Sequence, residues 1–195
     1  LHLGLIDTLD AAIADIDKEV NRELDPFRQA VRQLRTIPGL SDLTARVVVS
    51  EIGTDMGRFP TAGHLVSWAG LCPRNDESAG KRRSNRLRKG DPWLKTVLVQ
   101  CAWAGARKKG SYLRAQYQRL ARKRGPKKAI CAVAASILTA ACHMLRDGTF
   151  YRDLGEGHFQ RDTPEARAGR LAKQIERLGF NCTIAQAVEE EAVSV

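Results

Sequence analysis

The first part of the chain carries apolar residues at steps of three and four from Leu5 to Leu34, with charged residues between them. This spacing predicts a long amphipathic helix with one narrow apolar stripe. Pro26 lies inside the pattern, and proline removes a helical hydrogen bond, so we expect a kink or break near Asp25. A stripe this narrow fits pairing with another helix, within the chain or between two copies, and it also fits plain packing on a core.

A second helix follows a Pro-Gly break. Pro38 and Gly39 end the first helix, and the next is predicted from Ser41 or Asp42 to Gly53. The residues expected to face its core side are Leu43, Val47, Val48 and Ile52. An apolar residue, Pro-Gly and a helix in this order are similar to a helix-hairpin-helix, whose hairpin amides hold a phosphate. Ser41 replaces the second glycine of the usual hairpin, so a helical turn without any ligand is the alternative.

The rest of the pattern predicts an all-α protein. Helices are expected over residues 62–70, 93–109, 111–124 and 129–145 and from Thr163 or Pro164 to Gly179. Residues 129–145 carry no charge, so this helix is predicted at the centre of the bundle, with a membrane span as the rival interpretation. No alternating pattern predicts a strand. We expect an amphipathic helix over 1–35, a compact domain over 36–150 and a helical tail over 151–195 with a mobile end.

Positive charge is concentrated in one segment. Residues 74–128 hold 18 of the 32 Lys and Arg residues against three acidic residues, whereas the whole chain has a net charge of +10. This density attracts polyanions, and nucleic acid is the commonest of them, with membrane headgroups as the weaker competitor. The five cysteines are odd in number and far apart, and the four histidines are scattered. This fits a reducing cytosol and predicts no metal site.

The candidate chemistry lies in the loop over residues 72–92. It presents Ser78, with Asp76 and Glu77 as neighbours that can orient its hydroxyl, and then a run of cations. The predicted phosphate or nucleic-acid contacts are Gly39, Gly80, Lys81, Arg82, Arg83, Arg86, Arg88, Lys89 and Lys95. Guanidinium groups around an accessible hydroxyl suit a site that handles phosphodiesters. Ser84 lies in the same loop and is the alternative nucleophile. Glycine and like charge predict that residues 75–90 are not ordered without a partner.

Residues 34 to about 120 resemble the C-terminal transposase domain of the bacterial insertion-sequence 110 family, RNA-guided recombinases also called bridge recombinases. The motifs that carry the resemblance are Ile-Pro-Gly, Phe-x-x-Ala-x-x-Leu-x-x-Trp-Ala-Gly-Leu-x-Pro, Ser-x-Gly-Lys and Lys-Gly-Asp. Together they form a specific signature. The preceding helix is similar to the coiled-coil segment that joins the two halves of such transposases.

The resemblance implies a serine recombination mechanism. On the matching Ser-x-Gly motif the nucleophile is Ser78, which would attack a DNA phosphodiester and form a covalent phosphoserine link. In the family, an N-terminal RuvC-like domain supplies acidic residues that bind Mg²⁺, and a guide RNA pairs with donor and target DNA. Family assemblies are dimers to tetramers. Only the Ser-x-Gly spacing favours Ser78 over Ser84.

The metal-binding half of the family is absent from this sequence, which begins with Leu and not with Met. We therefore expect a fragment of a longer bacterial protein, cytoplasmic and nucleoid-associated, with no cofactor of its own and no membrane contact. It is expected to fold, bind nucleic acid and self-associate without recombining DNA. Two alternatives stay open. One is a non-catalytic helix-hairpin-helix module that grips DNA or RNA backbone, and the other is a structural basic protein that assembles on RNA.

Overall fold

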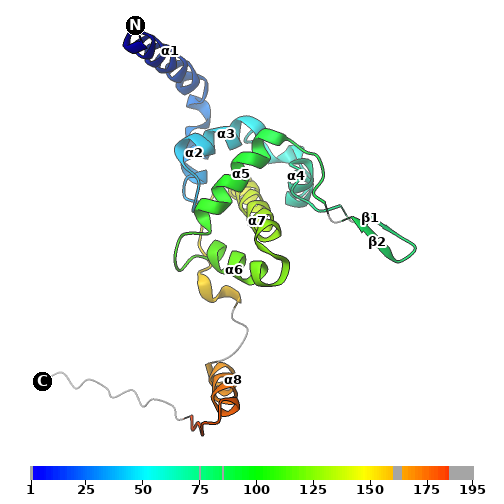
Figure 1. The fold of residues 1–195 in the computed structure, drawn as a ribbon. Coiled ribbons are helices and arrows are strands. Elements are labelled where there is room, and N and C mark those ends of the chain that lie inside the picture. Colours follow the sequence, from blue (N-terminus) through cyan, green and yellow to red (C-terminus); the bar gives the residue numbers. More distant parts are fainter. Residues whose placement is uncertain (1, 75, 85, 160–163, 185–195) are drawn as a thin grey trace, which may run out of the picture. The chain divides into compact units, whose positions relative to one another are not determined.

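The computed structural model describes residues 2–74, 76–84, 86–159 and 164–184, with only the backbone of residues 76, 82, 83, 164 and 167. The predicted mobile end, residues 189–195, lies outside these residues. The chain divides into two compact units, residues 1–157 and 158–195. The regular elements among the described residues are helices apart from one short hairpin (Figure 1), which confirms the all-α class.

The elements are α1 (His2–Glu23), η1 (Asp25–Phe27), α2 (Arg28–Leu34), α3 (Asp42–Ile52), η2 (Met56–Arg58), α4 (Ala62–Trp68), β1 (Asp76–Ser78), β2 (Lys81–Ser84), α5 (Pro92–Gly105), α6 (Tyr112–Arg124), α7 (Pro126–Asp147), η3 (Glu156–Phe159) and α8 (Pro164–Arg177). The predicted helices are confirmed. The predicted break near Asp25 is also confirmed, because a 3-10 turn separates α1 from α2 there.

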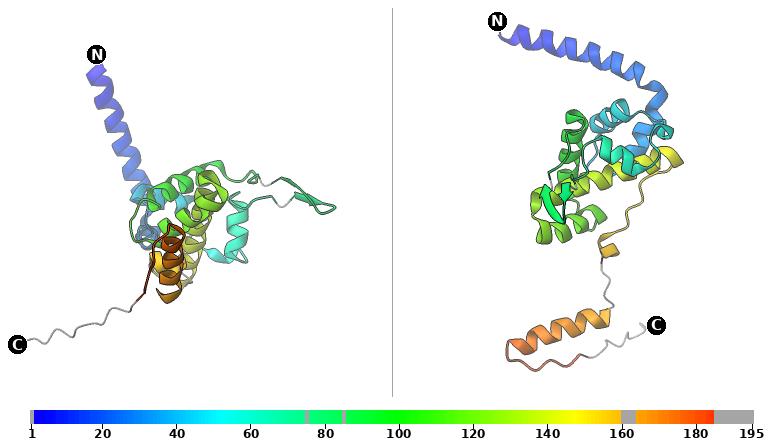
Figure 2. Two further views of the ribbon diagram at one scale, coloured as in Figure 1. Left: turned by 60° about the horizontal axis from the view of Figure 1, so that its bottom comes forward. Right: turned by 90° about the vertical axis from the view of Figure 1, so that its right-hand side faces the viewer.

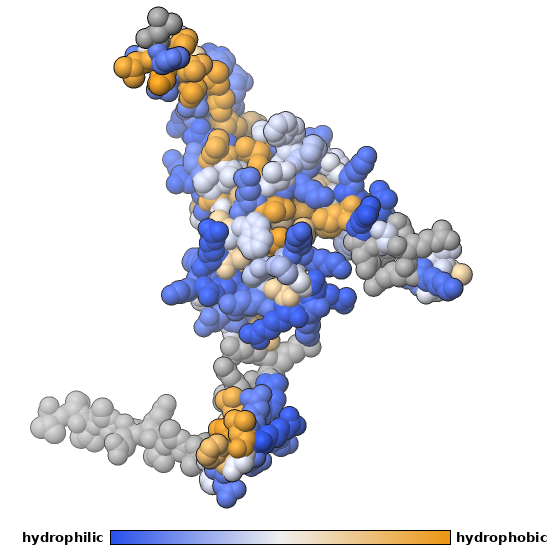
Figure 3. Space-filling view, in the orientation of Figure 1, coloured by the Kyte–Doolittle hydropathy of each residue, from blue (hydrophilic) through white to orange (hydrophobic). Residues whose placement is uncertain are grey.

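The apolar stripe of α1 is exposed. Leu5, Leu9, Ile13 and Ile16 are each more than half exposed, and α1 has no buried residue. Figure 3 shows these apolar side chains gathered along α1. The stripe therefore does not pack on the core of this unit, and pairing with another helix stays a prediction.

The core is built around α7. This helix packs against α4, α5 and α6, and its buried side chains include Ile130, Val133, Ile137 and Leu138. The predicted central position is therefore confirmed. Among the described residues, α7 is the one helix long and apolar enough to cross a membrane, and 50% of its most apolar window is buried inside the fold. That burial is what the central helix of a bundle requires.

Helix α3 begins and ends as predicted, and its inward face was predicted in part: Val48 and Ile52 are buried as expected. The Ser41 Oγ accepts the Thr44 backbone N–H at 3.2 Å, and Gly53 ends the helix with a φ of 72°. The buried residues are Ala45, Val48, Val49 and Ile52. The prediction that Leu43 faces inward is wrong, since it is 71% exposed. Leu43 lies two positions, about 200° of helical rotation, from Ala45 and therefore on the opposite face.

Candidate nucleic-acid interface

Residues 70–90, here called the basic arm, leave and re-enter the helical body at two touching glycines. Gly70 has a φ of 70°, and a Cβ added to it would lie 2.7 Å from the backbone nitrogen of Gly90. A Cβ added to Gly90 would lie 2.6 Å from the Gly70 Cα. Neither backbone leaves room for a side chain. The two ends of the arm are thus held together between α4 and α5.

The basic arm continues outward as an antiparallel ribbon. Beyond its base, Arg88 N donates to Cys72 O at 3.4 Å, Pro73 pairs with Leu87, and Arg74 N donates to Arg86 O at 2.8 Å. Strands β1 and β2 then pair, with Ser78 directly opposite Lys81. The hairpin projects from the helical body in Figure 1 and in the left view of Figure 2.

The tip of the basic arm is a two-residue turn. Ala79 and Gly80 have φ values of 51° and 72°, and a tight hairpin turn of this kind needs positive φ at both central residues. The prediction that the chain has no strand is therefore wrong for residues 76–78 and 81–84, which form the hairpin. Strands of three and four residues are too short for an alternating pattern to be read from the sequence.

The two candidate serines differ in their surroundings. Ser78 is the last residue of β1, is exposed, and stands directly before the turn. Among the described residues, the Ser78 hydroxyl forms no hydrogen bond, and this includes the neighbouring Glu77 carboxylate. The Asp76 side chain is not among the described atoms. Ser84 is half-buried, and its Oγ accepts the backbone N–H of Arg86 at 3.2 Å. The structure thus presents the Ser78 hydroxyl at the tip and engages that of Ser84 in a local turn.

The predicted cations lie along the basic arm and at its base. The side chains of Lys81, Arg86, Arg88 and Lys89 are exposed. Arg82 and Arg83 belong to β2, and their side chains lie outside the described residues. Lys95 extends from α5 and its Nζ donates to the Arg88 carbonyl at 3.4 Å. Lys95 therefore joins α5 to the returning strand of the arm.

Gly39 lies in the α2–α3 turn, packed against the backbone of α5. A Cβ at this position would lie 2.5 Å from the backbone nitrogen of Gly105, and the φ of Gly39 is 94°. A Cβ on Gly105 would in turn lie 2.6 Å from the Pro38 carbonyl oxygen. Close packing and backbone conformation together account for glycine here. A phosphate contact at Gly39 stays a prediction.

Two carboxyl groups meet where the basic arm enters α5. Asp91 caps α5, since its Oδ1 accepts the backbone N–H groups of Trp93 at 2.8 Å and Leu94 at 3.1 Å. The hydrogen bond from Leu94 is the main cause that lowers the pKa of Asp91, and desolvation partly opposes it. The pKa of Glu51, on α3, is raised by its hydrogen bond to Asp91, then by burial and by the negative charge of Asp91.

Sequence reasoning missed several residues near this surface. Trp93, in the first turn of α5, is 75% exposed, and Arg124, Lys127 and Lys128 cluster where α6 meets α7. The charge count over residues 74–128 included these three cations but did not single them out. Gln116 of α6 is buried beside them, and no sequence signal marks it.

Metal ligands do not gather in the described part of the chain. Within it, no group of three or more His, Cys, Asp or Glu side chains lies close enough together to hold a metal ion.

Comparison with known protein families finds a match over the central part of the chain. Residues 31–118, from α2 into α6, match the family described as Transposase IS116/IS110/IS902 family. This match supports a transposase domain of that family in this part of the chain.

Two curated relatives support the assignment. The chain is 34% identical over 120 residues to the Insertion element IS110 uncharacterized 43.6 kDa protein of Streptomyces coelicolor, covering 60% of this chain and 29% of that protein. It is 33% identical over 91 residues to the Transposase for insertion sequence element IS1328 of Yersinia enterocolitica, covering 46% of this chain and 27% of the relative. The matched regions span less than a third of either relative.

Proposed function

We propose that this chain is the nucleophile-bearing part of an insertion-sequence transposase, in which Ser78 attacks a DNA phosphodiester. The observation that carries the proposal is the exposed Ser78 hydroxyl at the tip of a cation-rich arm within a transposase-family domain. The domain match makes DNA the expected substrate. The arm geometry supports presentation of the hydroxyl to a phosphate outside the protein.

The number of phosphodiester bonds stays the same in this reaction. Ser78 Oγ forms a bond to phosphorus, the bond from phosphorus to one deoxyribose oxygen breaks, and that oxygen leaves with a proton. The hydroxyl proton of Ser78 passes to a base. Attack of another DNA hydroxyl on the phosphoserine reverses the chemistry and frees the serine, so strand exchange needs no external fuel.

The cations of the arm stabilise the extra negative charge of this reaction. A pentacovalent phosphorus transition state carries more charge on its oxygens than the ground state, and fixed cations near it lower the barrier. Lys81 is the residue paired with Ser78 in the hairpin register, and Arg86 and Arg88 lie farther along the same strand path. These residues bind the attacked phosphate and its neighbours.

The proposal extends to the full-length protein, which contains further domains and partners. A preceding RuvC-like domain holds Mg²⁺, a guide RNA pairs with donor and target DNA, and copies associate as a dimer or tetramer in the bacterial cytoplasm. The exposed apolar stripe of α1 supports association between copies, because a helix face of this kind is stabilised by a partner.

The test uses the full-length parent protein with its RNA, magnesium and end-labelled donor DNA, quenched in SDS and separated on a denaturing gel. Ser78→Ala should abolish the protein-linked DNA band. Ser84→Ala is the matched control in the same hairpin and should retain it. A band that survives Ser78→Ala overturns the assignment. Absence of the band from every lane, with DNA binding intact, favours a non-catalytic module that grips nucleic-acid backbone.

A further inference from the structure

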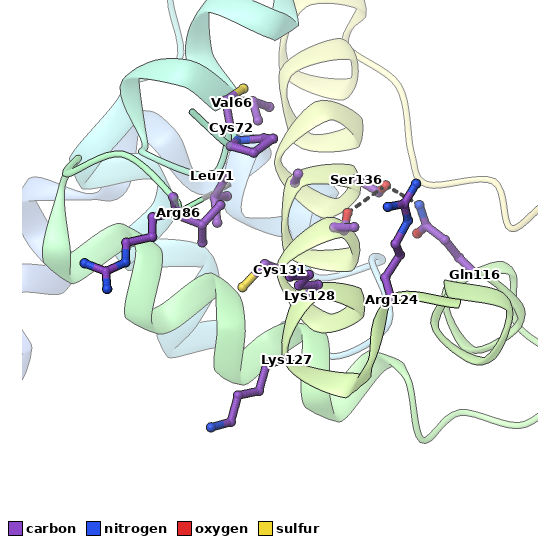
Figure 4. Close-up of a pocket in the computed structure, with 14 residues that line it drawn as sticks. Val66, Leu71, Cys72, Arg86, Gln116, Arg124, Lys127, Lys128, Cys131 and Ser136 are labelled. Carbon is purple, nitrogen blue, oxygen red and sulfur yellow. Dashed lines mark hydrogen bonds between the residues drawn. The ribbon is translucent and has the colours of Figure 1, made fainter. Parts of the chain in front are cut away.

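A cavity of about 920 Å³ lies between the base of the basic arm, α6 and α7 (Figure 4). Its walls are mainly apolar and include Val66 of α4, Leu87 of the arm, and Cys131 and Ala135 of α7. Pockets that bind small organic groups have volumes of about 300–1,000 Å³ and apolar walls with few polar groups. This cavity is separate from the arm tip that carries Ser78.

One polar group at this cavity, the side-chain amide of Gln116, has an oxygen without a hydrogen-bond partner. Gln116 lines the cavity and is only 8% exposed. Its Nε2 donates to the Ser136 Oγ at 2.8 Å, while its Oε1 has no hydrogen-bond partner. A buried acceptor left unpaired costs free energy, so a ligand that brings an N–H donor is favoured once the Gln116 side chain turns this oxygen, which has less than 1 Å² of accessible surface, toward the cavity.

The neighbouring hydrogen bond decides which end of the Gln116 amide is free. The Ser136 hydroxyl donates its one proton to the Ala132 carbonyl oxygen at 3.1 Å. Ser136 Oγ can therefore only accept from Gln116, which requires the NH₂ group to face Ser136. Figure 4 shows both bonds as dashed lines. The unpaired atom is thus the oxygen, and the ligand must be a donor.

The rim of the cavity is cationic. Arg86 from the basic arm, Arg124 from α6, and Lys127 and Lys128 from α7 all line it and are exposed. The last two lie in the first turn of α7, where Gly125 at the cap has no side chain to satisfy the backbone N–H groups. Free N–H groups and the positive end of a long helix attract phosphate. An anion is therefore favoured at the rim.

We propose that this cavity binds one unpaired nucleotide, with the base inside and its phosphate at the cationic rim. Every nucleobase offers an N–H donor on its pairing edge, a flat apolar face and an attached phosphate. These three features match the Gln116 oxygen, the apolar walls and the rim. A base in a duplex uses that donor for pairing and is stacked, so it enters only when unpaired or extruded. The inference rests on the proposed function for its nucleic-acid partner, and the base can belong to DNA or to the guide RNA.

The test compares binding of the full chain to a short duplex with one bulged nucleotide and to the same duplex fully paired, in DNA and in RNA. Ala135→Leu fills the cavity. Ala140→Leu is the matched control, because Ala140 is also half-buried on α7 but lines a different pocket with Tyr112 and His143. Wild type and Ala140→Leu should prefer the bulged probe about tenfold, equivalent to about 1.4 kcal/mol, and Ala135→Leu should bind both probes equally.

A second pair of variants tests the hydrogen bond. Gln116→Met should lower the preference for the bulged probe, whereas Gln33→Met, a change at another buried amide outside the cavity, should not. Circular dichroism confirms that each variant is folded. Preference for the DNA bulge alone assigns the base to DNA, and preference for the RNA bulge alone assigns it to the guide.

The outcomes separate this inference from the proposed function. A tenfold preference that persists in both Ala135→Leu and Gln116→Met overturns the nucleotide cavity, while Ser78 chemistry is unaffected. Wild type that binds neither duplex overturns the nucleotide cavity together with nucleic-acid binding by this chain. Ser78→Ala should keep the preference, since Ser78 does not line the cavity.

Discussion

Gly70 and Gly90 cross with their backbones in contact, and this crossing closes the base of the basic arm. The contact is between residues 20 positions apart and leaves no volume for a methyl group on either partner. Together with the Lys95 to Arg88 hydrogen bond, this crossing sets where the arm leaves the domain.

Gly90→Ala should therefore destabilise the domain. Its Cβ would meet backbone atoms that cannot rotate away, and overpacking of this kind costs about 1–3 kcal/mol of unfolding free energy or more. Urea unfolding followed by tryptophan fluorescence measures the loss. Gly63→Ala is the control, because a Cβ there makes only an ordinary 3.4 Å contact with Thr61 and should change stability by at most about 1 kcal/mol. Equal effects of the two changes would contradict the crossing.

Gly39→Ala tests whether this glycine serves packing. The substituted Cβ would lie 2.5 Å from the Gly105 nitrogen, so we expect a loss of unfolding free energy above about 3 kcal/mol. Gly110→Ala controls for backbone conformation, since Gly110 also has a positive φ, of 71°, but has open space around it. That change should cost about 1–2 kcal/mol. If Gly39→Ala were as stable as Gly110→Ala and only weakened nucleic-acid binding, the phosphate role would be favoured.

Glu51→Gln should raise stability at neutral pH. The pKa of Glu51 is higher in the folded protein than its ordinary value. The stability that Glu51 contributes is therefore present below its ordinary pKa and is lost as pH rises through the pKa of the folded state. The substituted amide would keep a donor toward Asp91 without the second negative charge. The gain should be below about 1 kcal/mol because the pair is partly exposed, and should vanish near pH 4.

A substitution of Asp91 should affect stability with the opposite pH dependence. The folded pKa of Asp91 is lowered, so its stabilisation is present above the ordinary pKa and is lost as pH falls through the folded value. Asp91→Ala should cost about 0.5–2 kcal/mol at pH 7, the usual value of a helix cap. Urea unfolding at several pH values measures both variants, and a Glu51→Gln gain that is the same at pH 4 and pH 8 would contradict the pairing.

The salt dependence of DNA affinity should measure how many phosphates the basic arm contacts. Each lysine or arginine that neutralises a phosphate adds close to one to the slope of log affinity against log salt. Arg88→Ala and Lys89→Ala should each reduce that slope by about 1 on duplex DNA. Lys18→Ala is the control, because Lys18 lies on α1 and pairs with Asp15 at 3.0 Å. A slope unchanged by all three variants would place the bound DNA elsewhere.

The helices of this protein were predictable because their signals are local. The Ser41 cap, the Gly53 stop and the uncharged run in α7 each act through neighbours within a few residues, so sequence spacing reveals them. The charge count over residues 74–128 located the basic segment, and the Ser-x-Gly spacing selected Ser78 as a candidate. The inward face of α3 was partly misread because Leu43 is apolar and yet exposed.

Tertiary structure decided how these parts form a surface. The Gly70 and Gly90 crossing, the Gly39 contact with α5, and the Gln116 bond to Ser136 join residues that are far apart in the sequence. Such contacts depend on how backbones approach and on which polar atom is left unpaired, and neither leaves a periodic pattern in the chain. The sequence alone determined the helices and the basic character of residues 74–128, whereas packing in three dimensions formed the arm and the cavity, because distance between backbones is a property of the folded chain.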